Sequence, residues 1–330
     1  MRTLSGSLAT AFLAAATSLL PAQTEEHLTK TFAAPVDGLL LVEVPFGAID
    51  VAGDATNQVR IDVWRRITRS SDADEKRFLQ EHPVQFKLDG NSVSVRSRAG
   101  EVAGLHWFSG SRSRNEARYV IRVPAHFNVT LHTSGGAIRA VDIEGEARAD
   151  TSGGPLQFER IRGPLLGNTS GGSIRASNCE GAIHLETSGG SIDVSGGKGS
   201  VRAETSGGPI RVIQFQGPAM ANTSGGGITF ESVAGEIKGE TSGGSVRAQV
   251  PSPVPGNVFL STSGGSVIVL LPGDAAFDLH AATFGGGVHC DFPVPGPASK
   301  ERNKLHGPVH GGGPALRLET SGGSIRVEKM

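Results

Sequence analysis

The sequence predicts an all-β protein, a single-stranded β-solenoid (β-helix) with coils of 18 residues and one short inserted helix near the N-terminus. The first observation is a repeated Thr-Ser-Gly-Gly motif, and self-similarity at a short fixed period is typical of stacked supersecondary units. The motif begins at Thr133, Thr151, Thr169, Thr187, Thr205, Thr223, Thr241, Thr262 and Thr320, with a Thr-Phe-Gly-Gly variant at Thr283. Six intervals of 18 residues are followed by two of 21 and one of 37.

The second observation is an apolar pattern locked to the motif. Five and seven residues after each Thr stands an apolar residue, as at Ile174 with Ala176 and Ile192 with Val194. A gap of two places both side chains on one face of a strand. Two and four residues before the Thr the pattern recurs, for example at Leu185 and Ile183. Each repeat therefore predicts two strands whose apolar faces form one core.

The third observation is the placement of glycine. The Gly-Gly of the motif and a glycine six residues before its Thr, such as Gly181, separate the two strands of each repeat. Glycine takes positive φ at little cost, so we expect left-handed conformations at these corners. A unit this short cannot bury its apolar face alone, but stacked neighbours share a continuous core. At ~4.8 Å per coil, ten coils would form a rod on the order of 50 Å long.

The motif threonines continue the inward parity of the strand before them. We expect their hydroxyls to form a ladder inside the corner, with hydrogen bonds running along the rod. An exposed threonine array of the ice-binding type is the alternative. An ice-binding array needs flat rows of outward threonines. Here each Thr stands directly against a glycine corner, which disfavours that alternative.

Residues 1–22 are predicted to be a secretory signal peptide, with Arg2 as the one charge, an apolar run, and Ala22 at the cut. We therefore expect an exported protein that is periplasmic, on the cell surface or secreted. No later stretch is long enough to span a bilayer. The expected layout is an N-terminal region of degenerate coils and cap over 23–132, and repeats over 133–330. The two would form one continuous domain over 28–330.

Before the repeats, several elements are expected. Residues 44–51 match the repeat offsets without Thr-Ser and indicate a degenerate first coil. Residues 72–82 predict a helix capped by Asp72 and ended by Pro83. Strands are expected at 84–88, 92–98, 119–123 and 127–131.

Two irregular segments are candidate interaction sites. Residues 99–117 are expected to form a loop with Trp107 and Phe108, and residues 291–315 an excursion with His306 and His310. Loops on a rigid scaffold often carry binding residues. For Trp107, packing onto the end of the core is the favoured alternative. We expect no catalytic, cofactor-binding or metal-binding residues, because His280, His289, His306 and His310 lack a ligand spacing.

Outward positions alternate in charge along the stack. The residue before each Thr is acidic or amide, and the sixth residue after it is often arginine, as at Arg175, Arg211 and Arg247. The favoured interpretation is a solvated surface that sets the register; the alternative is a charged face for a glycan polymer. The net charge of −1 gives no basic footprint for nucleic acid.

The Thr-Ser-Gly-Gly-x-Ile repeats and the closing segment HGGGPALRLETSGGSIRVEK resemble a bacterial domain-of-unknown-function family of β-strand-repeat adhesin-like proteins. The resemblance covers residues 38–330. It implies an exported β-solenoid and carries over no site residue.

Two functions from different classes compete. The leading hypothesis is a non-catalytic cell-surface or periplasmic interaction scaffold. It would be a monomer without a transmembrane anchor, and its partner would be an envelope glycan or protein. The alternative is a polysaccharide-acting β-helix enzyme, a lyase or hydrolase. Such an enzyme needs carboxylates that converge in a groove. The outward acidic residues instead form single columns interrupted by Asn, which do not predict such a groove.

Overall fold

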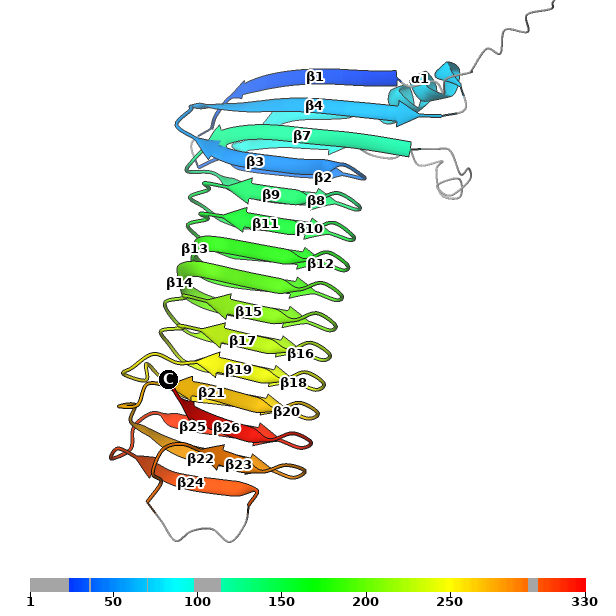
Figure 1. Ribbon diagram of the computed structural model, residues 1–330. Coiled ribbons are helices and arrows are strands. Elements are labelled where there is room, and N and C mark those ends of the chain that lie inside the picture. Colours follow the sequence, from blue (N-terminus) through cyan, green and yellow to red (C-terminus); the bar gives the residue numbers. More distant parts are fainter. Residues whose placement is uncertain (1–23, 36, 70, 98–113, 296–301) are drawn as a thin grey trace, which may run out of the picture.

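The computed structural model describes residues 24–35, 37–69, 71–97, 114–295 and 302–330. Within these residues the protein is almost entirely β structure, with 26 strands in one hydrogen-bonded sheet and one α-helix. The strands lie one above another as the rungs of a tall stack (Figure 1). The predicted all-β class with one short helix is confirmed.

Two rows of strands make up the stack. We call row A the series that carries the residues before each motif threonine, and row B the series that carries the residues after the motif. In stacking order row A comprises β5 (Val84–Asp89), β6 (Ser92–Ser97), β2 (Leu39–Val44), β8 (Asn128–Thr133), β10 (Ala147–Thr151), β12 (Leu165–Thr169), β13 (Ile174–Thr187), β14 (Ile192–Thr205), β16 (Ala219–Thr223), β18 (Ile237–Thr241), β20 (Val258–Thr262), β25 (Ala315–Thr320), β22 (Phe277–Thr283) and β24 (Lys304–Val309).

Row B stands opposite. In stacking order it comprises β1 (Thr24–Ala33), β4 (Gln58–Thr68), β7 (Arg114–Pro124), β3 (Ala48–Asp54), β9 (Ile138–Val141), β11 (Leu156–Glu159), β13, β14, β15 (Ile210–Ile213), β17 (Ile228–Glu231), β19 (Val246–Gln249), β21 (Val267–Leu271), β26 (Ile325–Lys329) and β23 (Val288–Cys290). The 14-residue strands β13 and β14 contribute to both rows.

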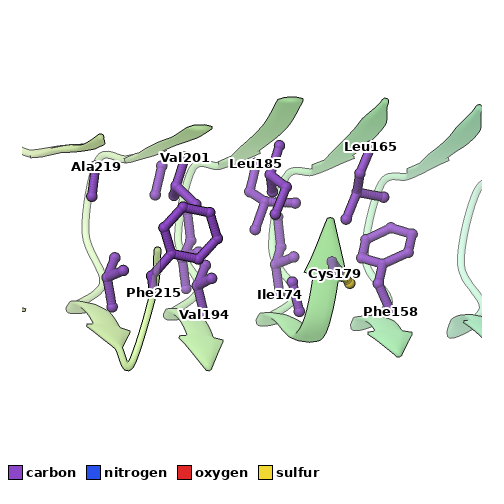
Figure 2. Close-up of a cluster of buried hydrophobic side chains, with 14 of the residues drawn as sticks. Phe158, Leu165, Ile174, Cys179, Leu185, Val194, Val201, Phe215 and Ala219 are labelled. Atoms are coloured by element: carbon purple, nitrogen blue, oxygen red, sulfur yellow. The ribbon is translucent and has the colours of Figure 1, made fainter. Parts of the chain in front are cut away.

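The core lies between the rows. From β8 to β18 each residue pairs in parallel with the residue 18 positions later, so equivalent side chains stack in columns. Leu165 and Val201 point from row A toward Phe158 and Val194 of row B (Figure 2), and all four are nearly fully buried. The apolar offsets of the sequence are confirmed as the inward positions.

The motif threonines tie each coil to the next. All ten are buried. Thr187 is typical: its Oγ1 donates to the carbonyl oxygen of Gly172 in the preceding coil at 2.9 Å and accepts from the N–H of Gly190 at 3.2 Å. The inward placement is confirmed, although the hydroxyls bond to glycine backbone rather than to one another. The exposed-array alternative is wrong.

The glycines of the motif serve close approach rather than positive φ. Gly190 is the second glycine of its motif, and a Cβ added to it would lie 1.9 Å from the carbonyl oxygen of Gly172 in the neighbouring coil. Across all ten copies the corresponding distance is 1.7–2.3 Å. None of these glycines has positive φ, so that expectation was wrong for the motif. It holds for Gly163 and Gly217, which precede β12 and β16, and for Gly181 and Gly199 at the equivalent places inside β13 and β14.

The opposite corner has a left-handed residue of its own. Nine positions after the Thr, non-glycine residues adopt φ of 53–57°, with Gly196 filling the same place at 68°. These residues are Asp142, Arg160, Asn178, Gln214 and Ser232. Each turns the chain so that the next side chain, such as Ile161 or Phe215, enters the core.

Chain order and stack order differ at the C-terminal end. β25 pairs with β20 on one side and β22 on the other, so the last motif, at Thr320, lies between those of Thr262 and Thr283. β24 then closes row A, antiparallel to β22 (Figure 1). The excursion expected over 291–315 is therefore wrong in part, because it contains β24 and the first residue of β25.

The N-terminal end adds strands and a helix to the stack. Where the sequence predicted a degenerate first coil, β2 pairs with β8 and β3 pairs with β9. The helix α1 (Asp72–Glu81) is present, but its N-cap is Ser71, whose side chain accepts from the N–H of Asp74, and not Asp72. The loop expected over 99–117 ends earlier, because β7 begins at Arg114. The strand β1 was not predicted, because the side chains on both of its faces are mostly polar.

We predict that Gly190→Ala destabilises the fold and Gly189→Ala does not. The first places a methyl group 1.9 Å from a backbone carbonyl oxygen, whereas at Gly189 the nearest atom is 3.7 Å away. Forcing two coils apart should cost at least ~2 kcal/mol, and the control should stay within ~0.5 kcal/mol. Urea unfolding of both variants measures this. If Gly190→Ala lowered the free energy of unfolding no more than Gly189→Ala does, the coils could move apart at little cost, which would contradict the prediction.

A second pair tests the inward and outward parity. Ile192 is fully buried, and Asp193 beside it is half-exposed. We expect Ile192→Asp to cost several kcal/mol because it buries an unpaired carboxylate. Asp193→Ala should change the free energy of unfolding by no more than ~0.5 kcal/mol. Similar losses of thermal stability in the two variants would contradict the assignment of faces.

Candidate functional site

The outer surface of row B carries a groove, which we call the arginine groove. Its volume is about 500 Å³, and its lining comes from β3, β7, β9, β11, β13 and the residues that precede three of these strands. The lining residues are Ala48, Ile49, Asp50, Arg118, Ala137, Ile138, Arg139, Pro155, Leu156, Gln157, Ser173 and Arg175.

The repeat itself builds this groove. Four residues after the motif Thr the side chains are small, as at Ala137, Pro155 and Ser173, and these form a low floor. Six residues after it they are long, and the register places Asp50, Arg139, Gln157 and Arg175 in one file across β3, β9, β11 and β13. The column of small side chains beside the column of long side chains forms a channel that runs along the stack.

Positive charge exceeds negative charge in the groove. Asp50 is its one carboxylate, and it is shared by Arg118, with Nη2 3.8 Å from Oδ2, and Arg139, with Nη1 3.5 Å from Oδ1. Arg139 also reaches Glu159, with Nη2 3.4 Å from Oε2. These pairs are partly exposed and each is weak.

Arg175 is different. It is exposed, and within the described part of the chain it has no carboxylate in ion-pair contact. The same holds there for Arg211 on β15 and Arg247 on β19, although the register places Asp193 of β14 opposite both Arg175 and Arg211 in this file. A guanidinium without a partner offers up to five donors in a fixed planar fork, which suits carboxylate, sulfate or phosphate oxygens.

One carboxylate lines the groove. Hydrolysis of a glycosidic bond uses two carboxyl groups on either side of the bond. The groove lining supplies one, and two arginines already hold it. Its residues can therefore orient an anionic chain, and they do not form the carboxylate pair of a hydrolase.

The predicted interaction residues are scattered. Trp107 and Phe108 lie outside the described residues. His306 is exposed on β24 opposite His280 of β22. His310 has a φ of 50°, and its Nδ1 is hydrogen-bonded to the carbonyl oxygen of Ala275 at 2.9 Å.

These histidines form no common site. His289, on β23, pairs instead with Asp291, with Nε2 3.0 Å from Oδ1. His310 packs its ring edge-on to Phe292, with ring centroids 6.1 Å apart, at a turn. The structure thus gives His310 a packing and turn role, and it does not bring His310 together with His306.

The groove lies outside the two irregular segments that the sequence singled out, although its Arg118 directly follows the first of them. Its signal was present in the sequence as a small residue just before a strand and a long residue two positions later, repeated in neighbouring coils. What the sequence did not show is that Arg118, from a non-repeat strand, completes the groove through the pairing of β7 with β3.

Known proteins give limited guidance. The chain matches no protein-family model and no curated protein. Solved structures similar to it include a proposed cell adhesion protein from Clostridium sporogenes (12% identity, 93% of this chain and 100% of that one, TM-score 0.21). Two proposed adhesins are also similar. The one from Bacteroides fragilis has 7% identity over 92% of this chain and 97% of that one, with a TM-score of 0.30. The one from Parabacteroides distasonis has 11% identity over 94% of this chain and 98% of that one, with a TM-score of 0.32. TM-scores this low establish neither a shared fold nor a shared function.

One further property concerns membranes. Among the described residues, the single helix α1 has ten residues and is too short and too polar to cross a bilayer.

Proposed function

We propose that the chain is an exported, non-catalytic β-solenoid that acts as an adhesin-like interaction scaffold of the cell envelope. The observation that carries the proposal is the arginine groove, a positively charged channel on a face whose shape the repeat fixes. In this proposal the stacked repeats form one continuous domain over residues 28–330, and residues 1–22 direct its export.

The solenoid assignment rests on register. Each repeat contributes one strand to row A and one to row B, and the threonine and glycine contacts join it to its neighbours alone. Such one-dimensional stacking gives an extended surface whose outward positions recur at ~4.8 Å along the axis. A linear polymer is the partner whose own repeats can follow such a surface.

The charge of the groove defines the partner further. Arg118, Arg139 and Arg175 against the single Asp50 leave an excess of positive charge, and Ala137 and Pro155 give an apolar floor. The proposed ligand is an envelope glycan or an extended protein segment that bears carboxylate or phosphate groups. The overall charge of −1 means that this attraction is local to the groove and not a property of the whole surface.

We expect the double variant Arg139→Gln and Arg175→Gln to lose binding to cell-envelope fractions. Glutamine already occupies this column at Gln157, so the stack should accept it. Losing charge-assisted hydrogen bonds worth ~1.5–3 kcal/mol each should weaken binding by about tenfold or more per arginine. Sedimentation of the mature chain with isolated envelope material, at low and high salt, measures the loss.

The matched control is Arg148→Gln with Arg317→Gln, which removes two exposed arginines from the outer face of row A. It should bind as the parent does. Trp107 and Phe108 are a second proposed contact, tested by changing both to alanine. If that variant loses binding while the groove variant keeps it, the groove is not the site.

A further inference from the structure

Three side chains of metal-ligating type gather on the outer face of row A. They are His184 and Glu186 of β13 and Glu204 of β14, and one donor atom from each lies within 4.8 Å of the others. Glu186 stands directly opposite Glu204 in the parallel pair, and His184 is on the same face two residues before Glu186. This face is turned away from the arginine groove, because row B carries the groove.

The repeat supplies its own comparison for this cluster. The residue before each motif Thr forms a column in which an acidic residue otherwise meets a residue that is not acidic. In stacking order the column is Glu43, His132, Asp150, Asn168, Glu186, Glu204, Asn222, Glu240, Ser261, Glu319 and Ala282. Glu186 and Glu204 are the one place in it where two carboxylates face each other.

The neighbouring column changes at the same level. Three residues before the Thr, the coils on either side of the cluster carry Leu166 and Met220, which cannot serve as hard ligands. Histidine occurs at this position in the coil of Glu186. The acid–acid contact and the histidine therefore coincide, although each belongs to a separate column.

The two carboxylates have unequal partners. Glu204 Oε1 accepts from Arg202 Nη2 at 2.6 Å. Glu186 has no cationic partner within the described part of the chain. Like charges directly opposite each other destabilise a sheet, and elsewhere in the column each acid is opposite Asn, His, Ser or Ala. A bound cation would remove the repulsion.

We propose that His184, Glu186 and Glu204 form a binding site for a divalent transition-metal ion of the zinc type. One imidazole nitrogen and two carboxylate oxygens are ligands that zinc and its neighbours accept. Three protein ligands leave a further coordination position for water or for a donor atom of a partner. Arg202 stays hydrogen-bonded to the carboxylate of Glu204 and orients it, as residues behind a metal ligand commonly do.

The place in the fold favours a defined geometry. β13 and β14 are 14-residue strands paired through both rows, so the ligands stand on adjacent, continuous backbones. His184 and Glu204 are half-buried, while Glu186 is exposed. The site is open to solvent and can be reached by an ion or a partner. It stands on its own observations and does not depend on the proposed function.

The test is titration of the chain, without a histidine tag, with Zn²⁺ by calorimetry and with Co²⁺ by visible absorption. The variants come from the protein's own repeats. His184→Leu copies Leu166, and Glu186→Asn copies Asn168 and Asn222. Because these residues already stand in neighbouring coils, the variants should fold, and thermal unfolding confirms it. We expect one ion per chain and a loss of affinity of at least about tenfold in each variant.

Glu240→Gln is the matched control, since it removes an acid of the same column whose neighbours are Asn222 and Ser261. It should bind zinc as the parent does. The proposal is overturned if the parent shows no saturable binding. It is also overturned if both His184→Leu and Glu186→Asn keep the parent's affinity, or if Glu240→Gln loses as much as they do.

Discussion

The structure depends on the contact between the second glycine of each motif and the backbone of the coil before it. A Cβ at this point would lie 1.7–2.3 Å from a carbonyl oxygen of the neighbouring coil, so only glycine lets the corners stack at sheet spacing. The same close approach brings the buried threonine hydroxyl within reach of that carbonyl and of the N–H of its own glycine. Two backbone groups at a largely buried corner are thereby satisfied, as buried polar groups must be.

This contact also fixes the register and hence both outer faces. When the corners are in register, every residue 18 positions apart is stacked, and an outward column inherits whatever the sequence places there. Within each column, like charges in adjacent coils must therefore be kept apart. Asn168 between Asp150 and Glu186 shows how: its Nδ2 donates to Asp150 Oδ1 at 2.8 Å. The arginine groove and the cluster of His184, Glu186 and Glu204 are departures from uniformity within such columns.

Sequence reasoning succeeded where a rule is local or periodic. The inward positions followed from the offsets of residues such as Ile192 and Val194. The helix predicted over 72–82 from its composition is present as Asp72–Glu81. Sequence reasoning failed where pairing is non-local. Nothing in residues 315–330 indicates that β25 and β26 enter the stack before β22 and β23, because all these motifs share the same glycine and threonine contacts. The cap strand β1 was missed because its contacts are mostly polar, including the pairing of its Glu26 with the buried Arg65.

The same distinction bears on where function lies in a repetitive chain. Breaks in the period draw attention in a sequence, and they led to Trp107, Phe108, His306 and His310. The structure gives His310 a packing role at a turn and leaves His306 beside a single histidine neighbour. In a stack with a fixed register, a site can instead arise without any break in the period, when two adjacent coils carry unusual residues in neighbouring columns. Such a pair of coils differs from its neighbours in those side chains alone, because the backbone of the stack repeats from coil to coil.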